Sequence, residues 1–126
     1  MYTDFLTKIK NAQAARKEYV KISYSNLDFA IAELLVREGY LEAVAKKGRM
    51  PKRVIEVKLK YVDKQGAISG LRFLSRPSLK VFSGYRALRK VRQGYGVAVL
   101  TTPKGIMTGA EARKAQEGGQ LLFEIW

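Results

Sequence analysis

The tract from Thr101 to Gly109, with the sequence TTPKGIMTG, gathers the side chains best suited to polar chemistry: three hydroxyls, one ammonium and two glycines. One interpretation of this tract is structural: it forms a strand-to-helix loop, and Thr108 caps the helix that follows. The pattern from Thr108 to Glu111 fits a capping box, in which hydroxyl and carboxylate each bond a backbone N–H of the other residue.

A second interpretation of the same tract is that it binds a nucleic acid. The hydroxyls of Thr101 and Thr102 can donate to or accept from base edges and 2′-OH groups. Lys104 can contact a phosphate, and Gly105 lets the backbone approach a ligand closely. The two interpretations are compatible, because a cap at the end of the tract leaves its first residues available.

Enzymatic catalysis has little support in the residue types. The chain has no His and no Cys, which removes the commonest general base, thiol nucleophiles and cysteine-held metal sites. A hydroxyl nucleophile needs a base within reach, and no carboxylate stands near the tract before Glu111. We therefore expect no enzyme activity, no cofactor and no metal. An enzyme acting on a phosphorylated substrate is the alternative from a different class.

Basic charge is concentrated in the middle of the sequence. The chain of 126 residues carries 24 Lys and Arg against 11 Asp and Glu, a formal net charge of +13. Residues 45–110 hold sixteen of the basic and only two of the acidic side chains, and residues 64–110 contain no carboxylate. Such a segment is typical of a protein that binds a polyanion, above all a nucleic acid. A solvated basic face and an anionic membrane surface are the alternatives.

Apolar periodicity predicts an α+β protein made of two small lobes, residues 1–65 and 66–126. The first lobe combines helix, strand and helix with a strand pair or small sheet, and the second is mostly β with a short capped helix. Helices are predicted over 4–17, 25–39, 85–91 and 108–119, and strands over 19–24, 40–44, 53–61, 71–74, 79–82, 97–102 and 121–126. No apolar stretch approaches the roughly 18 residues of a membrane span, so we expect a cytoplasmic protein without membrane contact.

Several motifs in order resemble bacterial small-subunit ribosomal protein eight. The tract at 101–108 is similar to that family's signature S-T-S-K-G-V-M-T. The other similar segments are DFLTKIKNA at 4–12, EGYL at 38–41, SRPSLKV at 75–81, GYGVAVL at 94–100, and ARKA at 112–115 followed by Gly118 and Gly119. The resemblance therefore covers nearly the whole chain.

This resemblance implies a structural component of the small ribosomal subunit. Family members are primary rRNA-binding proteins that bind the central domain of 16S rRNA, mainly through the C-terminal lobe, and help to assemble the subunit platform. The implied partners are that rRNA domain, small-subunit ribosomal proteins five and twelve, and the protein's own operon mRNA. The alternative is a regulatory RNA-binding protein that represses translation outside the ribosome.

The resemblance also implies which residues contact RNA. The signature tract maps to Thr101, Thr102, Lys104, Gly105 and Thr108. The full set of residues that we expect to contact RNA is Thr101, Thr102, Pro103, Lys104, Gly105, Arg76, Lys80, Arg86 and Gln120. Three departures from the family pattern affect the expected site: Ser78 stands in place of Gly, Pro103 in place of Ser, and Gln120 in place of Glu. Pro103 removes one hydroxyl, and Gln120 replaces a pure acceptor with an amide that also donates.

Overall fold

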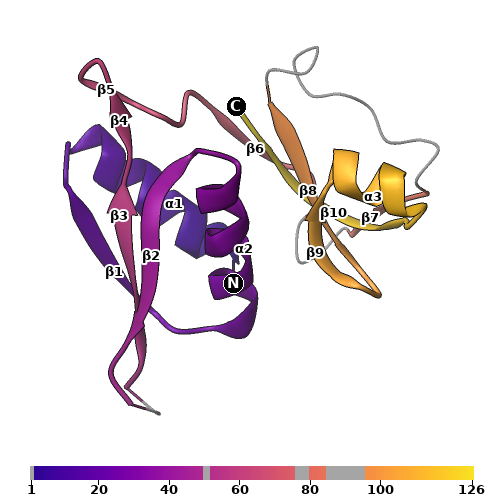
Figure 1. The fold of residues 1–126 in the computed structure, drawn as a ribbon, viewed down its shortest axis with the longest axis horizontal. Helices are drawn as coiled ribbons and strands as arrows, with labels where there is room; N and C mark the ends of the chain where they lie inside the picture. The colour runs from indigo at the N-terminus through magenta and orange to yellow at the C-terminus, as the bar shows by residue number, and fades with distance from the viewer. Residues whose placement is uncertain (1, 50–51, 76–79, 85–95) are drawn as a thin grey trace. The chain divides into compact units, whose positions relative to one another are not determined.

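The computed structural model describes residues 2–49, 52–75, 80–84 and 96–126, and it divides into two compact units, residues 1–67 and 68–126. Helices and antiparallel sheets occur in both units, so the predicted α+β class is confirmed (Figure 1). The helix predicted over 85–91 lies outside the described residues.

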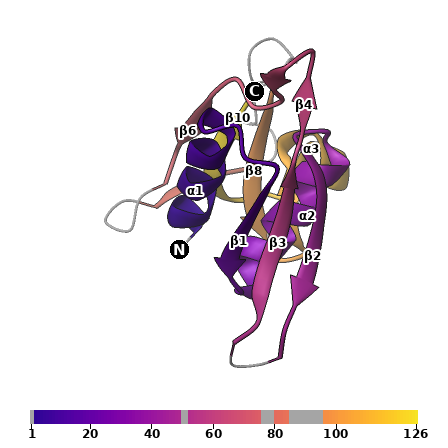
Figure 2. The same cartoon turned by 90° about the vertical axis from the view of Figure 1, so that its left-hand side faces the viewer.

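The first unit consists of two helices on one side of a three-stranded antiparallel sheet of order β1-β3-β2 (Figure 2). Its elements are α1 (Tyr2–Ala14), β1 (Tyr19–Ser23), α2 (Asn26–Arg37), β2 (Leu41–Lys47), β3 (Val54–Leu59), β4 (Tyr61–Val62) and β5 (Gln65–Gly66). Alternate residues of the central strand are buried, namely Ile55, Val57 and Leu59, as the period of a strand requires.

Local end signals set the limits of the helices in this unit. Ser25 is the N-cap of α2, and its hydroxyl accepts a hydrogen bond from the Asp28 backbone N–H at 3.4 Å, as predicted. Gly39 follows the C-cap residue with φ +87°, a conformation that glycine adopts without strain. The prediction that α1 extends to residue 17 is wrong, because Arg16 adopts a positive φ of 57° and the helix ends at Ala14.

The second unit is built around one long strand. Its elements are β6 (Leu71–Phe73), β7 (Val81–Ser83), β8 (Val97–Thr102), β9 (Gly105–Thr108), α3 (Gly109–Ala115) and β10 (Gly119–Ile125). β10 pairs antiparallel with β8 along one edge and with β6 and β7 along the other. Helix α3 packs on this sheet, where Ala112 joins Leu100 in a buried cluster that Met107 and Leu121 flank.

Candidate functional site

The tract at 101–109 forms a hairpin, and the interpretation as a strand-to-helix loop is wrong in this respect. Strand β9 pairs with the end of β8, with Thr102 opposite Gly105, so that Pro103 and Lys104 are the two residues of the turn. Gly105 takes a φ of +118°, which the turn requires and which residues with a side chain rarely adopt. The hairpin presents Lys104 at its exposed tip.

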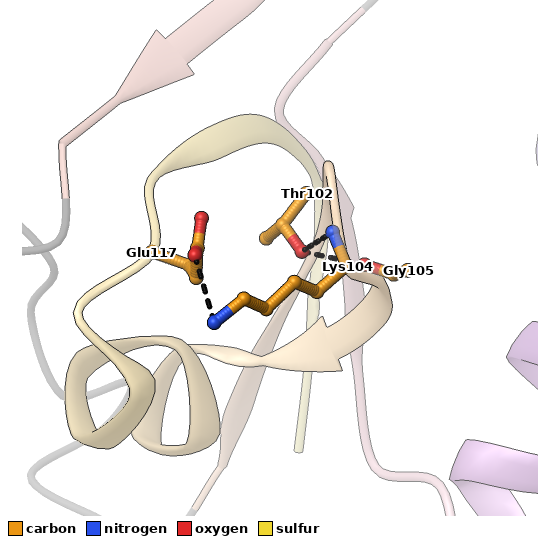
Figure 3. A network of polar contacts seen from close by, with 4 residues as sticks. All are labelled: Thr102, Lys104, Gly105 and Glu117. Atoms are coloured by element: carbon orange, nitrogen blue, oxygen red, sulfur yellow. Dashed lines mark hydrogen bonds and ion pairs between the residues drawn. The ribbon is translucent and has the colours of Figure 1, made fainter.

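The hydroxyl of Thr102 holds this turn together (Figure 3). It accepts a hydrogen bond from the Lys104 backbone N–H at 3.1 Å and donates one to the Gly105 carbonyl oxygen at 2.9 Å. Thr102 is only 8% exposed. The group that the sequence suggested for ligand contact therefore stabilises the turn in the free protein.

Lys104 forms an ion pair that the sequence did not reveal. Its Nζ lies 3.2 Å from Oε1 of Glu117, and the two side chains are 64% and 24% exposed (Figure 3). Glu117 follows α3, where Gln116 in the left-handed conformation, with φ 57°, turns the chain back toward the hairpin. The prediction that Gly118 and Gly119 close this helix is thus wrong, because Gln116 already ends it. No spacing along the sequence could have identified the pair, since it depends on that reversal.

Thr108 caps α3 as predicted. Its hydroxyl accepts from the Glu111 backbone N–H at 3.2 Å, while Oε1 of Glu111 accepts from the Thr108 backbone N–H at 3.3 Å. Both halves of the capping box are present, and Thr108 is buried. The box fixes where β9 ends and α3 begins, and so anchors the far end of the hairpin.

An open groove of about 610 Å³ lies beside the hairpin. It is lined by residues from β7, β8, β10 and the segments next to them: Phe82, Gly84, Thr101, Thr102, Pro103, Gly118, Gly119 and Gln120. Gln120 pairs in register with Thr101 on one side and with Phe82 on the other. Because residues paired in register point to the same face of a sheet, these three side chains form a row across it. Phe82 is 69% exposed.

The groove brings together four of the expected contact residues, Thr101, Thr102, Pro103 and Gln120. Lys104 and Gly105 belong to the adjoining hairpin, and Lys80 is exposed directly before β7. Arg76 and Arg86 lie outside the described residues, as does the departure at Ser78. The sequence did not identify Phe82, because an aromatic residue in a short strand is ordinarily part of the core. Only its position in the sheet shows that this side chain is exposed.

Other kinds of site find no support in the parts of the chain that the structure describes. Within residues 2–49, 52–75, 80–84 and 96–126, no three carboxylates gather into a group that could hold a metal ion. No helix in these same ranges is long and apolar enough to cross a membrane.

These features define an α+β protein in two units, with a strongly basic middle segment and an open groove in the second unit. The chain belongs to the family described as Ribosomal protein S8, whose model matches residues 1–126. The small ribosomal subunit protein uS8 of Persephonella marina is 45% identical over an alignment of 131 residues, gaps included. The alignment covers 98% of this chain and 95% of the relative. The protein of the same name from Acetivibrio thermocellus is 42% identical over 124 residues, covering 98% and 94%. That from Vesicomyosocius okutanii is 39% identical over 123 residues, with the same coverage.

Family membership confirms the resemblance noted in the sequence. The chain is a structural component of the small subunit of the cytoplasmic ribosome, and it is not an enzyme. The alternative of an enzyme acting on a phosphorylated substrate is therefore wrong.

Proposed function

We propose that the second unit binds rRNA directly through the groove and the neighbouring hairpin. In this proposal the target is the central domain of 16S-type rRNA, and binding there helps to assemble the platform of the subunit. The observation that carries the proposal is the row of Phe82, Gln120 and Thr101 along one open groove.

The chemistry of the row suits unpaired nucleotides. The exposed ring of Phe82 offers a face on which a base can stack, a contact worth roughly 1–3 kcal/mol for each base. The hydroxyl of Thr101 and the amide of Gln120 both donate and accept, so they can bond base edges and the 2′-OH. These contacts can distinguish one RNA site from another.

Positive charge around the groove supports the backbone part of the proposal. Lys80 and Lys104 are exposed on two of the segments beside the groove. Contacts from lysines to phosphates position an RNA and release condensed counterions, which makes binding weaken with salt. Family membership supports extending the proposal to contacts with small-subunit proteins five and twelve and to binding of the operon mRNA.

The test compares the affinity of the full chain for a central-domain fragment of 16S rRNA with that for a shuffled RNA of equal length. We expect a clear preference for the fragment and a log–log salt slope well below zero. Phe82→Ala should weaken binding to the fragment by about 5- to 150-fold, the equivalent of losing one stacked base. Tyr19→Ala, which removes an exposed aromatic ring from the first unit, is the matched control and should change the Kd less than about twofold.

Two results would contradict the proposal: equal affinity for the two RNAs, or equal effects of the Phe82 and Tyr19 substitutions. Because the chain is a structural component of the small subunit, the alternative of a regulator that acts only outside the ribosome is wrong.

A further inference from the structure

The ammonium that the proposed function assigns to an RNA phosphate already has a carboxylate partner in the free protein, since Lys104 Nζ lies 3.2 Å from Glu117. We propose that Glu117 is a specificity-determining residue of the RNA site. It holds Lys104 in place and disfavours phosphate contacts from RNAs that do not also fill the groove. This inference rests on the proposed function.

Backbone hydrogen bonds fix both ends of the pair. The Lys104 N–H donates to the Thr102 hydroxyl at 3.1 Å, which anchors the lysine at the tip of the hairpin. The Glu117 N–H donates to the Ala112 carbonyl at 2.9 Å, which anchors the glutamate against the end of α3. Only the side chains remain to be ordered, so the pair is formed from two residues that are already close.

Glu117 is the carboxylate best placed to act on this hairpin. The sequence of the second unit contains three carboxylates, Glu111, Glu117 and Glu124. Glu111 is engaged in the capping box of α3, and Glu124 lies in β10 with Arg72 as its partner in register. Glu117 also directly precedes Gly118 and Gly119, which line the groove.

Electrostatics gives this arrangement an effect on selectivity. A carboxylate close to a phosphate repels it, and an ammonium that is already paired attracts it less. Binding of an unrelated RNA depends almost entirely on phosphate contacts. Such an RNA gains no contacts in the groove that could offset the repulsion by Glu117. An RNA seated in the groove holds its phosphate at a fixed place, where a lysine oriented in advance loses little entropy on binding. Glu117 should therefore weaken the binding of unrelated RNA more than the binding of the specific RNA site.

The experiment measures the Kd of the full chain for the central-domain fragment and for an unrelated duplex of equal length over a series of salt concentrations. Glu117→Gln should tighten binding of the unrelated duplex by about three- to tenfold at low salt and of the fragment by less than about twofold. The ratio of the two affinities should then fall. Glu124→Gln removes the same charge from the same unit and is the matched control, which should leave that ratio unchanged.

A double substitution shows whether the effect passes through the lysine. In a Lys104→Ala background, Glu117→Gln should change the affinity ratio less than it does in the parent, since only the direct repulsion between carboxylate and phosphate remains. A change as large as in the parent background, or an unchanged ratio in Glu117→Gln alone, would overturn the inference. Thermal unfolding of each variant checks for a purely structural role of Glu117. Such a role would lower the stability of the variant and weaken its binding to both RNAs alike, and that result would also overturn the inference.

The two proposals fail in different ways. If the parent protein shows no preference for the central-domain fragment, the proposed function fails and the role of Glu117 in selectivity fails with it. If the parent protein is selective and Glu117→Gln is equally selective, only the role of Glu117 is overturned.

Discussion

Gly119 lies directly against the backbone of Thr101: a Cβ added to this glycine would overlap the Thr101 carbonyl oxygen. The approach occurs at the start of β10, immediately before Gln120 pairs with Thr101. Both residues line the groove. The absence of a side chain at position 119 thus allows the two strands to come together where the proposed site lies.

Gly119→Ala should therefore damage both stability and binding. The added methyl group must displace backbone rather than a flexible side chain, and overpacking of this kind costs about 1–3 kcal/mol. Chemical denaturation would measure this loss, and we expect weaker binding of the central-domain fragment along with it. Gly109→Ala is the control, because a Cβ there would lie 3.7 Å from the Ala98 Cβ, an ordinary contact. Equal stability of the two variants would contradict this account.

Features set by neighbouring residues could be predicted from the sequence. The caps at Ser25 and Thr108 depend on residues three positions apart, and both occur as predicted. Strand β8 over Val97–Thr102 also matches its prediction, because its apolar run has sharp limits. Local hydrogen bonds and burial determine these elements, and residue types close together in the sequence indicate both.

Features that depend on distant residues could not be predicted. The strand β9 was missed because a two-residue turn at Pro103 and Lys104 differs little from a loop in sequence. The ion pair of Lys104 with Glu117 requires the left-handed Gln116 that reverses the chain after α3. The exposure of Phe82 follows from pairing with a strand almost forty residues further along the chain. Tertiary packing decides each of these.

Substitutions at Thr108 test the cap of α3. Thr108→Ala removes the hydroxyl that accepts from the Glu111 backbone N–H and should lower the free energy of unfolding by about 1 kcal/mol, within a range of about 0.5–2. Thr108→Ser keeps the hydroxyl and should recover most of this loss. Urea denaturation of the three proteins measures the difference. Three equal midpoints would show that the cap contributes nothing to stability.

Asp28 should make stability depend on pH. This carboxyl is 6% exposed, its Oδ1 makes no hydrogen bond with the described residues, and burial, with a smaller effect of Asp4, raises its pKa. The folded state therefore holds the proton more tightly than the unfolded state, in which the pKa is about 3.9. The stabilisation of the folded state by the protonated Asp28 carboxyl is complete below the unfolded-state pKa. It is lost as pH rises through the folded-state pKa.

Asp28→Asn removes this titration. We expect the stability of the variant relative to the parent to increase as pH rises from about 4 to 7, because only the parent must ionise a buried group. The difference between the two proteins cancels the contributions of all other carboxyls. Guanidinium denaturation at several pH values measures it. A difference that stays constant with pH would show that Asp28 ionises equally well in both states.

Pro103 is where the chain departs from the family signature inside the hairpin, and its role can be separated into hydrogen bonding and rigidity. It is the first residue of the two-residue turn, it is exposed, and it lines the groove. Proline holds φ near about −65° and keeps the preceding residue, Thr102, in an extended conformation. A rigid turn loses less entropy on binding, which can offset a missing hydrogen bond worth about 1 kcal/mol.

Replacing Pro103 by two smaller residues distinguishes these contributions. Pro103→Ser restores the hydroxyl of the family signature and should leave the Kd for the central-domain fragment within about tenfold of the parent. Pro103→Gly has neither hydroxyl nor rigidity, so it should weaken binding more and also lower the free energy of unfolding by about 0.4–1 kcal/mol. Measuring the Kd and the unfolding free energy of both variants separates a loss of affinity from a loss of fold. If Pro103→Gly binds the fragment as tightly as the parent, the rigidity of this turn contributes nothing to RNA binding.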